Sequence, residues 1–100
     1  MNQYFVYILL CSDNSFYIGV TNNIDRRLYE HSLNSVGYVS KRKPFKLLKS
    51  FEFNSITNAI DFEKQIKRWS SAKKKALIKE DWDRLSQLFE NSWFDKLTMT

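Results

Sequence analysis

The stretch from Tyr4 to His31 constrains this chain most, because its pattern predicts two strands joined by a turn and followed by a helix. Residues 4–11 are nearly all apolar and rich in aromatic and β-branched side chains, which is typical of a strand buried on both faces. Residues 12–15 have turn chemistry, with Asn14 expected at positive φ, and residues 16–20 predict a second strand. We therefore expect a β-hairpin whose first strand is central in a sheet.

The register of this hairpin decides whether Tyr7 and Tyr17 share a face. If Cys11 pairs with Phe16, the two phenols point to opposite faces, since side chains alternate along a strand. A loop with an odd count, which places Cys11 opposite Tyr17 or Ser15, brings both phenols to the same face. If both phenols serve one site, we predict such an odd register.

A helix is expected after the hairpin, capped by Asn22 or Asn23. Helical spacing gives it one inward face, made of Ile24, Arg27, Leu28 and His31. The two adjacent arginines are therefore not equivalent: Arg26 points outward and is expected to pair with Glu30, whereas Arg27 points toward the body of the protein. A purely structural role, in which the stem of Arg27 covers apolar surface, is the alternative.

The rest of the chain predicts one more strand and three more helices. Residues 45–53 alternate with a period of two, which predicts a strand with one mostly apolar face. The helices are expected near residues 56–69, 71–78 and 81–90. The predicted fold is therefore α+β, a small three-stranded antiparallel sheet flanked by helices in the order β-β-α-β-α-α-α. We expect one domain over residues 1–90 and a C-terminal tail, docked or disordered, over residues 91–100.

Glu63 falls on the apolar stripe of the second predicted helix, beside Ile56 and Ile60. A carboxylate at such a position is costly unless it is paired or bound to a metal. Two interpretations follow: a salt bridge to a lysine or arginine of another element, or a ligand to a hard cation such as Mg²⁺, which often takes only one or two protein ligands.

Positive charge is concentrated in the middle of the chain. Residues 41–79 carry a net charge of +9, whereas residues 1–40 carry −1 and residues 80–100 carry −3. Such a block is typical of a protein that binds a polyanion, although a solvated lysine-rich surface is the alternative. The candidate nucleic-acid-binding residues are Lys41, Arg42, Lys43, Lys67, Arg68, Lys73, Lys74 and Lys75.

Several classes of protein are excluded by composition. A single cysteine and a single histidine cannot form an ordinary zinc site, and the two glycines lie too far apart for a phosphate-binding loop. No apolar run is long enough to span a membrane, and no positively charged segment precedes the first apolar run as in an export signal. With one cysteine, a cytoplasmic protein is expected.

At this point the residues resemble a known family. The pair Val6-Tyr7-Ile8 and Tyr17-Ile18-Gly19 is similar to the two motifs that name the GIY-YIG nucleases. The resemblance runs over residues 4–80 and is closest to small stand-alone bacterial members. Its further matching positions are Thr21, Arg27, His31, Gly37-Tyr38, Pro44, Glu63-Lys64-Gln65 and Lys67-Arg68-Trp69.

The resemblance implies a role for each of five site residues. Tyr17 would act as general base or position the attacking water, with Tyr7 supporting it. Arg27 would hold the scissile phosphate. His31 would hydrogen-bond the phosphate or a tyrosine, or relay a proton. Glu63 would be the sole protein ligand of one divalent ion, Mg²⁺ or Mn²⁺.

Two positions depart from the family pattern. Phe5 replaces the first glycine, and Val20 stands where some members use a lysine that could activate the base. The resemblance implies a metal-dependent endonuclease acting on DNA, structure-selective as in repair or recombination, with RNA as the other candidate substrate. A catalytically weak or inactive nucleic-acid-binding module is the main alternative. A protein-interaction adaptor using residues 81–100 is the third, and the oligomeric state is left open.

Overall fold

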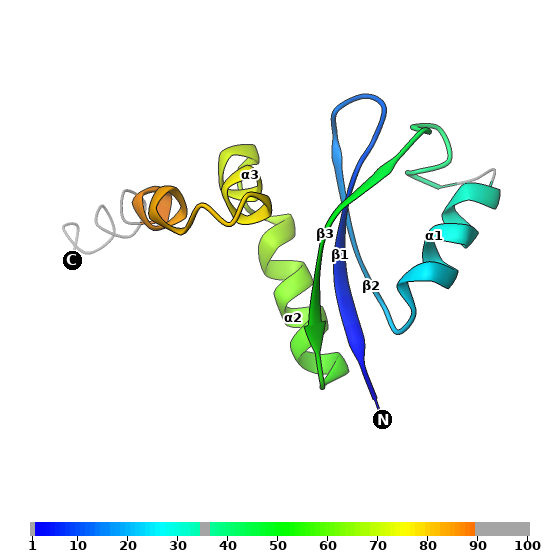
Figure 1. The fold of residues 1–100 in the computed structure, drawn as a ribbon, viewed down its shortest axis with the longest axis horizontal. Helices are drawn as coiled ribbons and strands as arrows, with labels where there is room; N and C mark the ends of the chain where they lie inside the picture. Colours follow the sequence, from blue (N-terminus) through cyan, green and yellow to red (C-terminus); the bar gives the residue numbers. More distant parts are fainter. Residues whose placement is uncertain (1, 35–36, 90–100) are drawn as a thin grey trace. The chain divides into compact units, whose positions relative to one another are not determined.

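The fold was analysed in a computed structural model, which describes residues 2–34 and 37–89. Six elements run in the order β1 (Tyr4–Leu10), β2 (Phe16–Thr21), α1 (Ile24–Leu33), β3 (Lys46–Phe53), α2 (Ile56–Lys67) and α3 (Ser71–Ile78) (Figure 1). A further helix covers residues 82–89. This is the predicted α+β order, β-β-α-β-α-α-α, which is confirmed.

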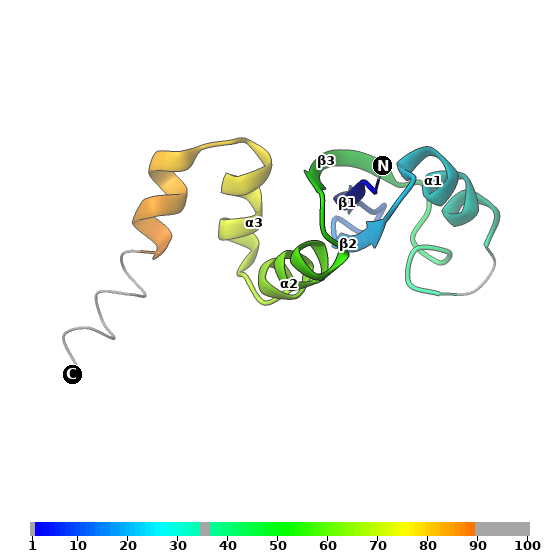
Figure 2. The ribbon, with the colours of Figure 1, turned by 90° about the horizontal axis from the view of Figure 1, so that it is seen from below.

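The described strands form one antiparallel sheet in the order β2-β1-β3. Helices α1 and α2 lie on opposite sides of it (Figures 1 and 2). Val6 and Ile8 are fully buried on one face of β1, and Tyr7 and Leu9 are at most 1% exposed on the other. The first strand is therefore central and covered on both faces, as its continuous apolar run predicts.

The hairpin between β1 and β2 has the odd register. Leu9 is opposite Tyr17 and Tyr7 is opposite Gly19, and the Cys11 amide donates to the Ser15 carbonyl at 2.9 Å. The pairing of Cys11 with Ser15 is one of the two registers that the sequence predicts. The three residues between them include Asn14, at the expected positive φ of 65°.

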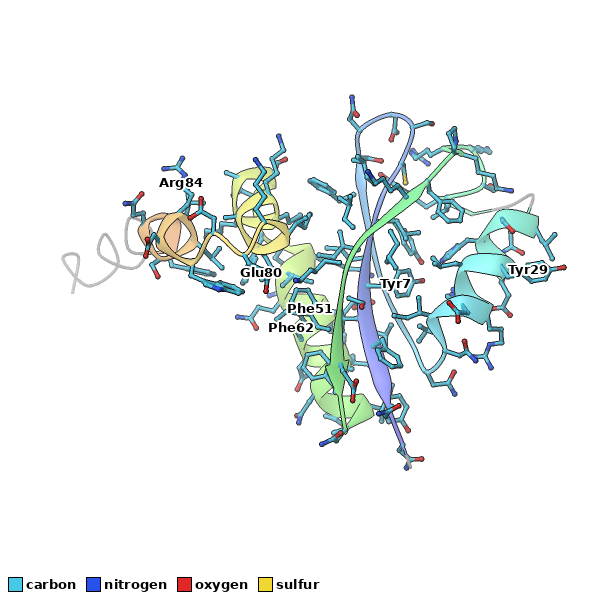
Figure 3. All side chains as sticks on the ribbon, viewed as in Figure 1. Tyr7, Tyr29, Phe51, Phe62, Glu80 and Arg84 are labelled. Carbon is cyan, nitrogen blue, oxygen red and sulfur yellow. The ribbon has the colours of Figure 1, made fainter. Side chains whose placement is uncertain are left out.

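Aromatic packing attaches α2 to its face of the sheet. The Phe62 ring lies 5.2 Å from the ring of Phe51 and 5.3 Å from that of Phe53 (Figure 3). Ala59 and Ile66 of the same helix are fully buried. The apolar line predicted for this helix therefore covers the sheet, because these positions recur at helical spacing.

The prediction of one apolar face for β3 is wrong. Ile8 pairs with Lys49 but Leu9 pairs with Leu47, so Leu48 is an extra residue that shifts the register. A bulge of this kind reverses the side-chain alternation on either side of it. Phe51 consequently faces α2, while Phe45, just before the strand, packs with Tyr7, Leu9 and Val39 on the α1 side.

Polar side chains cap the N-termini of the helices. Asn23 accepts from the Arg26 amide at 3.0 Å, and Ser70 accepts from the Lys73 amide at 3.3 Å. Ser55 accepts from the amide of residue 58 and so caps α2. Helix α2 ends two residues before the predicted end at residue 69. The tail predicted over residues 91–100 lies outside the described residues.

The chain divides into two compact units, one ending at Lys67 and the other beginning at Arg68. Within the second unit, the Trp69 ring meets the Phe89 ring edge-on at 4.9 Å, and the Lys73 ammonium lies 4.6 Å from the centre of the Phe89 ring. In the described parts of both units, no helix is long and apolar enough to cross a membrane.

Candidate active site

The site begins with the fit between Tyr7 and Gly19, which face each other across β1 and β2. A Cβ atom at Gly19 would lie 2.5 Å from the Tyr7 hydroxyl oxygen and 2.6 Å from Cζ, closer than any real contact allows. The glycine therefore lets the Tyr7 ring lie across β2. The group that approaches Gly19 so closely is a phenol from the neighbouring strand.

The Tyr7 hydroxyl is the centre of a buried hydrogen-bonded line. Arg27 Nε donates to it at 3.4 Å, and the hydroxyl lies 2.8 Å from His31 Nε2. Tyr7 is 1% and His31 6% exposed. The helical period that turns Arg27 and His31 inward is thereby confirmed, since both reach the same phenol from successive turns of α1.

Burial determines the protonation states of Tyr7 and His31. Loss of solvent, only partly opposed by the hydrogen bond from Arg27, raises the pKa of Tyr7 to about 12. Burial, and then the positive charge of Arg27, lowers the pKa of His31 below its usual 6.5. At neutral pH Tyr7 is therefore a hydroxyl that donates to a neutral imidazole, and we assign the imidazole proton to Nδ1.

The Tyr17 ring lies beside this line, on the face of the sheet that Tyr7 occupies. The centroid of the Tyr17 ring is 6.2 Å from that of the Tyr7 ring. The Tyr17 and His31 rings meet edge-on, with their centroids 5.2 Å apart. Tyr17 is half-buried and lines a small hollow of about 120 Å³, together with Arg27, His31 and residues of the segment after α1. We call this the inner hollow.

Arg27 connects the buried line to solvent. Its side chain is 39% exposed and lies 3.6 Å from the Glu30 carboxylate. The predicted pairing of Arg26 with Glu30 is therefore wrong: Glu30 pairs with Arg27, one residue closer, and Arg26 donates to Asn22 Oδ1 at 2.5 Å. Arg27 lines the inner hollow and also a larger one of about 470 Å³, the edge hollow, bordered by Val20 and Ile56.

Glu63 is not part of this cluster. It lies on α2, which covers the opposite face of the sheet, and its carboxylate is 3.1 Å from Lys67 Nζ. The salt bridge expected from another element thus comes from the same helix. Ile56 and Ile60, expected to be buried beside it, are 42% and 37% exposed, whereas the Glu63 side chain is 16% exposed.

The basic segment after α1 is largely engaged in internal contacts. Arg42 Nε donates to Asp13 at 2.9 Å, and its guanidinium lies 3.8 Å from the centre of the Tyr38 ring. Lys43 donates to the carbonyls of Ser32 and residue 34 at the end of α1. Of the three predicted nucleic-acid contacts here, Arg42 and Lys43 have structural partners, and Lys41 is exposed.

The remaining candidates for nucleic-acid contact also include both cations that contact other protein groups and cations that are exposed. Lys67 is paired with Glu63, and Lys73 lies over the Phe89 ring. Arg68 and Lys75 are exposed, and Lys74 is half-buried. Their contact with nucleic acid stays a prediction.

Tyr38 and Asp13 are residues that the sequence did not single out for the site. Tyr38 packs on Tyr17 and lines the inner hollow, and Asp13 holds Arg42 against Tyr38. The only indication in the sequence was the Gly37-Tyr38 pair, one of the positions at which the chain resembles the GIY-YIG nucleases. Neither residue lies in a periodic element that would have given its side chain a direction.

Within the described residues, no group of three His, Cys, Asp or Glu side chains comes together as a metal site. The carboxylate of Glu63 nevertheless fits a hard divalent ion: it is 16% exposed, offers oxygen donors, and is already paired with a single half-exposed lysine. An ion held by one carboxylate would keep most of its water ligands.

The fold and the cluster of two phenols, an arginine and a histidine define a GIY-YIG catalytic domain. A family model described as the GIY-YIG catalytic domain matches residues 3–76, so this chain belongs to the GIY-YIG family, whose members are typically nucleases that generally use divalent metal ions. The resemblance based on the two strand motifs is confirmed.

Close relatives are themselves small proteins. The chain is 40% identical over 87 residues to a UPF0213 protein of Syntrophus aciditrophicus, covering 85% of this chain and 100% of that one. The solution NMR structure of the UPF0213 protein BH0048 from Bacillus halodurans matches with a TM-score of 0.53 and 37% identity over 77% of this chain and 83% of that one. The NMR structure of EF2693 from E. faecalis matches with a TM-score of 0.59 and 31% identity, over 80% and 86%.

Proposed function

We propose that this chain is a metal-dependent endonuclease that hydrolyses phosphodiester bonds in DNA. The observation that carries the proposal is the buried line from Arg27 through Tyr7 to His31, with Tyr17 beside it and the Arg27 guanidinium reaching solvent. Catalysis of phosphodiester hydrolysis needs fixed positive charge at the phosphate and an oriented acceptor for the proton of water.

In this mechanism Arg27 binds the non-bridging oxygens of the scissile phosphate, for which its planar fork of donors is suited. Tyr7 cannot serve as the base, since burial raises its pKa to about 12. Its function is to hold the Nε of Arg27 and the Nε2 of His31 in place. Tyr17, whose ring borders the inner hollow, is the phenol left to accept a proton from the attacking water or to position that water.

Glu63 would hold the divalent ion, Mg²⁺ or Mn²⁺. Such an ion supplies positive charge to the phosphate oxygens and lowers the pKa of bound water. The edge hollow supports this assignment, because Ile56 lines it together with Arg27 and stands two helical turns before Glu63 on the same flank of α2. A phosphodiester lying along the outer edge of β2 would pass from the Arg27 side of the sheet to the Glu63 side.

The exposed cations Lys41, Arg68 and Lys75, with Lys74, are the residues we propose for contact with the nucleic-acid backbone. Phosphate contacts of this kind give affinity without sequence readout, so we propose a structure-selective enzyme of the repair or recombination type. We propose that the catalytic domain extends to residue 90, and that the protein acts in the cytoplasm, where its free, buried Cys11 would stay reduced.

The test is cleavage of branched, nicked and linear DNA, and of the matching RNA, with Mg²⁺ or Mn²⁺. Glu63→Gln should lower kcat/KM on the order of 100-fold or more, since it removes the charge that binds the ion. Asp61→Asn is the matched control, because Asp61 is an exposed carboxylate on the same helix. Equal activity of Glu63→Gln and Asp61→Asn would contradict the assignment of Glu63.

A nucleic-acid-binding module without catalysis is the second candidate. The specific observation in its favour is the pairing of Glu63 with Lys67, together with Val20 at the position of the family's lysine. This candidate predicts binding that weakens steeply with salt and no cleavage of any substrate with either metal. Metal-dependent cleavage that Glu63→Gln abolishes would exclude it.

A further inference from the structure

The candidate base Tyr17 has a neighbour that the proposed chemistry does not use. The Tyr38 ring lies 5.8 Å from the Tyr17 ring, inclined at 32°, a separation at which aromatic pairs attract. Tyr17 stands on β2, an outer strand of the sheet, and its other ring contacts are with Tyr7 and His31. Tyr38 is therefore an additional contact on Tyr17 from outside the sheet and α1.

Tyr38 is itself held by a fixed cation. The Arg42 guanidinium lies 3.8 Å from the centre of the Tyr38 ring and donates to the Tyr38 carbonyl at 2.9 Å. Its Nε donates to the Asp13 carboxylate in the β1–β2 turn, also at 2.9 Å. Arg42 is thus fixed at both ends, to the turn and to the ring that it covers.

The turn holds the same segment through its backbone. The Ser12 amide donates to the Arg42 carbonyl at 2.9 Å, and Val39, next to Tyr38, is 3% exposed in the cluster with Tyr7 and Leu9. Asp13 is in turn held by the Ser15 amide and hydroxyl. Backbone, apolar and ionic contacts therefore all fix the place of Tyr38.

We infer that Tyr38, held by Arg42 and Asp13, is a positioning residue that fixes the ring of Tyr17 at the inner hollow. The inference rests on the proposed function for its catalytic meaning. Without Tyr38, the Tyr17 ring could turn away from His31, and displacement of a catalytic group by about 1 Å can cost 10- to 100-fold in rate. The ring, not the hydroxyl, makes the contact.

A direct contact with substrate is the competing role. Tyr38 is 42% exposed, and an exposed aromatic ring can stack on an unpaired base. The two roles differ in their kinetic signature: a stacking contact with substrate changes KM or substrate affinity, whereas positioning of Tyr17 changes kcat.

The experiment compares Tyr38→Ala, Tyr38→Phe and Arg42→Lys, with Tyr29→Ala as control because Tyr29 is a 63% exposed tyrosine outside this cluster. Kinetics are measured on the DNA substrate that the wild type cleaves best. In parallel, NMR measures the nuclear Overhauser effects between the Tyr17 and His31 rings, which do not depend on activity.

Tyr38→Ala should lower kcat about tenfold with KM nearly unchanged, and should weaken the Tyr17–His31 signals. Tyr38→Phe and Tyr29→Ala should behave as wild type. Arg42→Lys should fall between them, since lysine keeps the charge for Asp13 but has no planar group to cover the ring. Unchanged Tyr17–His31 signals in Tyr38→Ala, or a change in KM alone, would overturn the inference.

Failure of the proposed function gives a different result. If the wild type cleaves no substrate while Tyr38→Ala still weakens the Tyr17–His31 signals, the positioning contact stands and the nuclease proposal falls. If the wild type cleaves and Tyr38→Ala leaves kcat unchanged, the nuclease proposal stands and the inference falls.

Discussion

The two faces of the sheet are built from different chemistry. The face toward α1 buries polar groups in one line, and among the described residues no buried side-chain nitrogen or oxygen lacks a hydrogen-bond partner. On the other face, Phe51 and Phe53 of β3 pack against Phe62 of α2. The carboxylate of Glu63, on the same helix, is paired with Lys67.

This difference predicts where the molecule is sensitive. A buried polar network is stabilising only while every member has its partner, because an unsatisfied polar group keeps the full cost of desolvation. An ion pair within one helix contributes little when one partner, here Lys67, is half-exposed and screened by solvent. Changes on the α1 face should therefore affect stability and activity together, whereas changes to the charges of α2 should affect activity alone.

The largest effect on stability is expected from Gly19→Ala. The added methyl group would overlap three atoms of the buried Tyr7 phenol, which has no room to move, so the overpacking should cost about 3 kcal/mol or more, the upper end of the usual range. The gain of strand propensity from removing a glycine, about 0.5–1 kcal/mol, is smaller. Urea unfolding measures the loss. In a Tyr7→Leu background, which lacks the overlapping ring atoms, Gly19→Ala should cost much less; an equal cost in both backgrounds would contradict the contact.

Tyr7→Phe comes next. It removes one oxygen atom, leaving His31 Nε2 without its donor and Arg27 Nε without its acceptor. We expect a loss of about 1–3 kcal/mol in the free energy of unfolding. Tyr29→Phe, at an exposed position on α1, is the control and should change stability by less than about 0.5 kcal/mol. Equal stability of Tyr7→Phe and wild type would show that the line contributes nothing to the fold.

The titration of His31 gives the third prediction. Its pKa is lowered in the folded protein, so below the unfolded value of 6.5 the unfolded chain binds a proton before the folded one does. Stability is therefore fully present above pH 6.5 and declines as the pH falls through the interval down to the folded pKa. The slope cannot exceed about 1.4 kcal/mol per pH unit for one group.

Urea unfolding at pH 7.5, 6.5 and 5.5 measures this slope. His31→Gln, which keeps a hydrogen-bonding group for Tyr7, should flatten it. An identical slope in His31→Gln and wild type would mean that another group is responsible.

The smallest effect is expected on the α2 face. Lys67→Gln removes the partner of Glu63, but the lysine side chain is 51% exposed, so the free energy of unfolding should change by less than about 0.5 kcal/mol. Urea unfolding next to Tyr7→Phe measures the contrast between the faces. A loss as large as that of Tyr7→Phe would remove the distinction on which the account depends.

Much of the α1 face follows from periodicity. The strand period and the requirement that both phenols share one face predict an odd register, with Cys11 opposite Ser15 or Tyr17, and the structure has the first of these; the helical period predicts the inward turn of Arg27 and His31. Both rules depend only on residues near in sequence, which is why they succeed without knowledge of the rest of the fold.

Features that depend on distant residues are not predicted. The bulge at Leu48 arises because Phe45 packs on one face while Phe51 packs on the other. The role of Arg42 depends on Asp13, 29 residues earlier in the chain. A run of positive charge predicts a binding surface, but its sequence does not indicate which cations are engaged by the protein itself.

The central claim is that Arg27, held by the Tyr7–His31 line, binds the phosphate that is cleaved. Metal-dependent DNA cleavage by Arg27→Ala and Arg26→Ala tests it most directly, because the two substitutions remove the same charge from adjacent positions and only Arg27 reaches Tyr7. We predict a loss of kcat on the order of 100- to 1,000-fold for Arg27→Ala and a change within a few fold for Arg26→Ala. Equal losses in the two variants would contradict the claim.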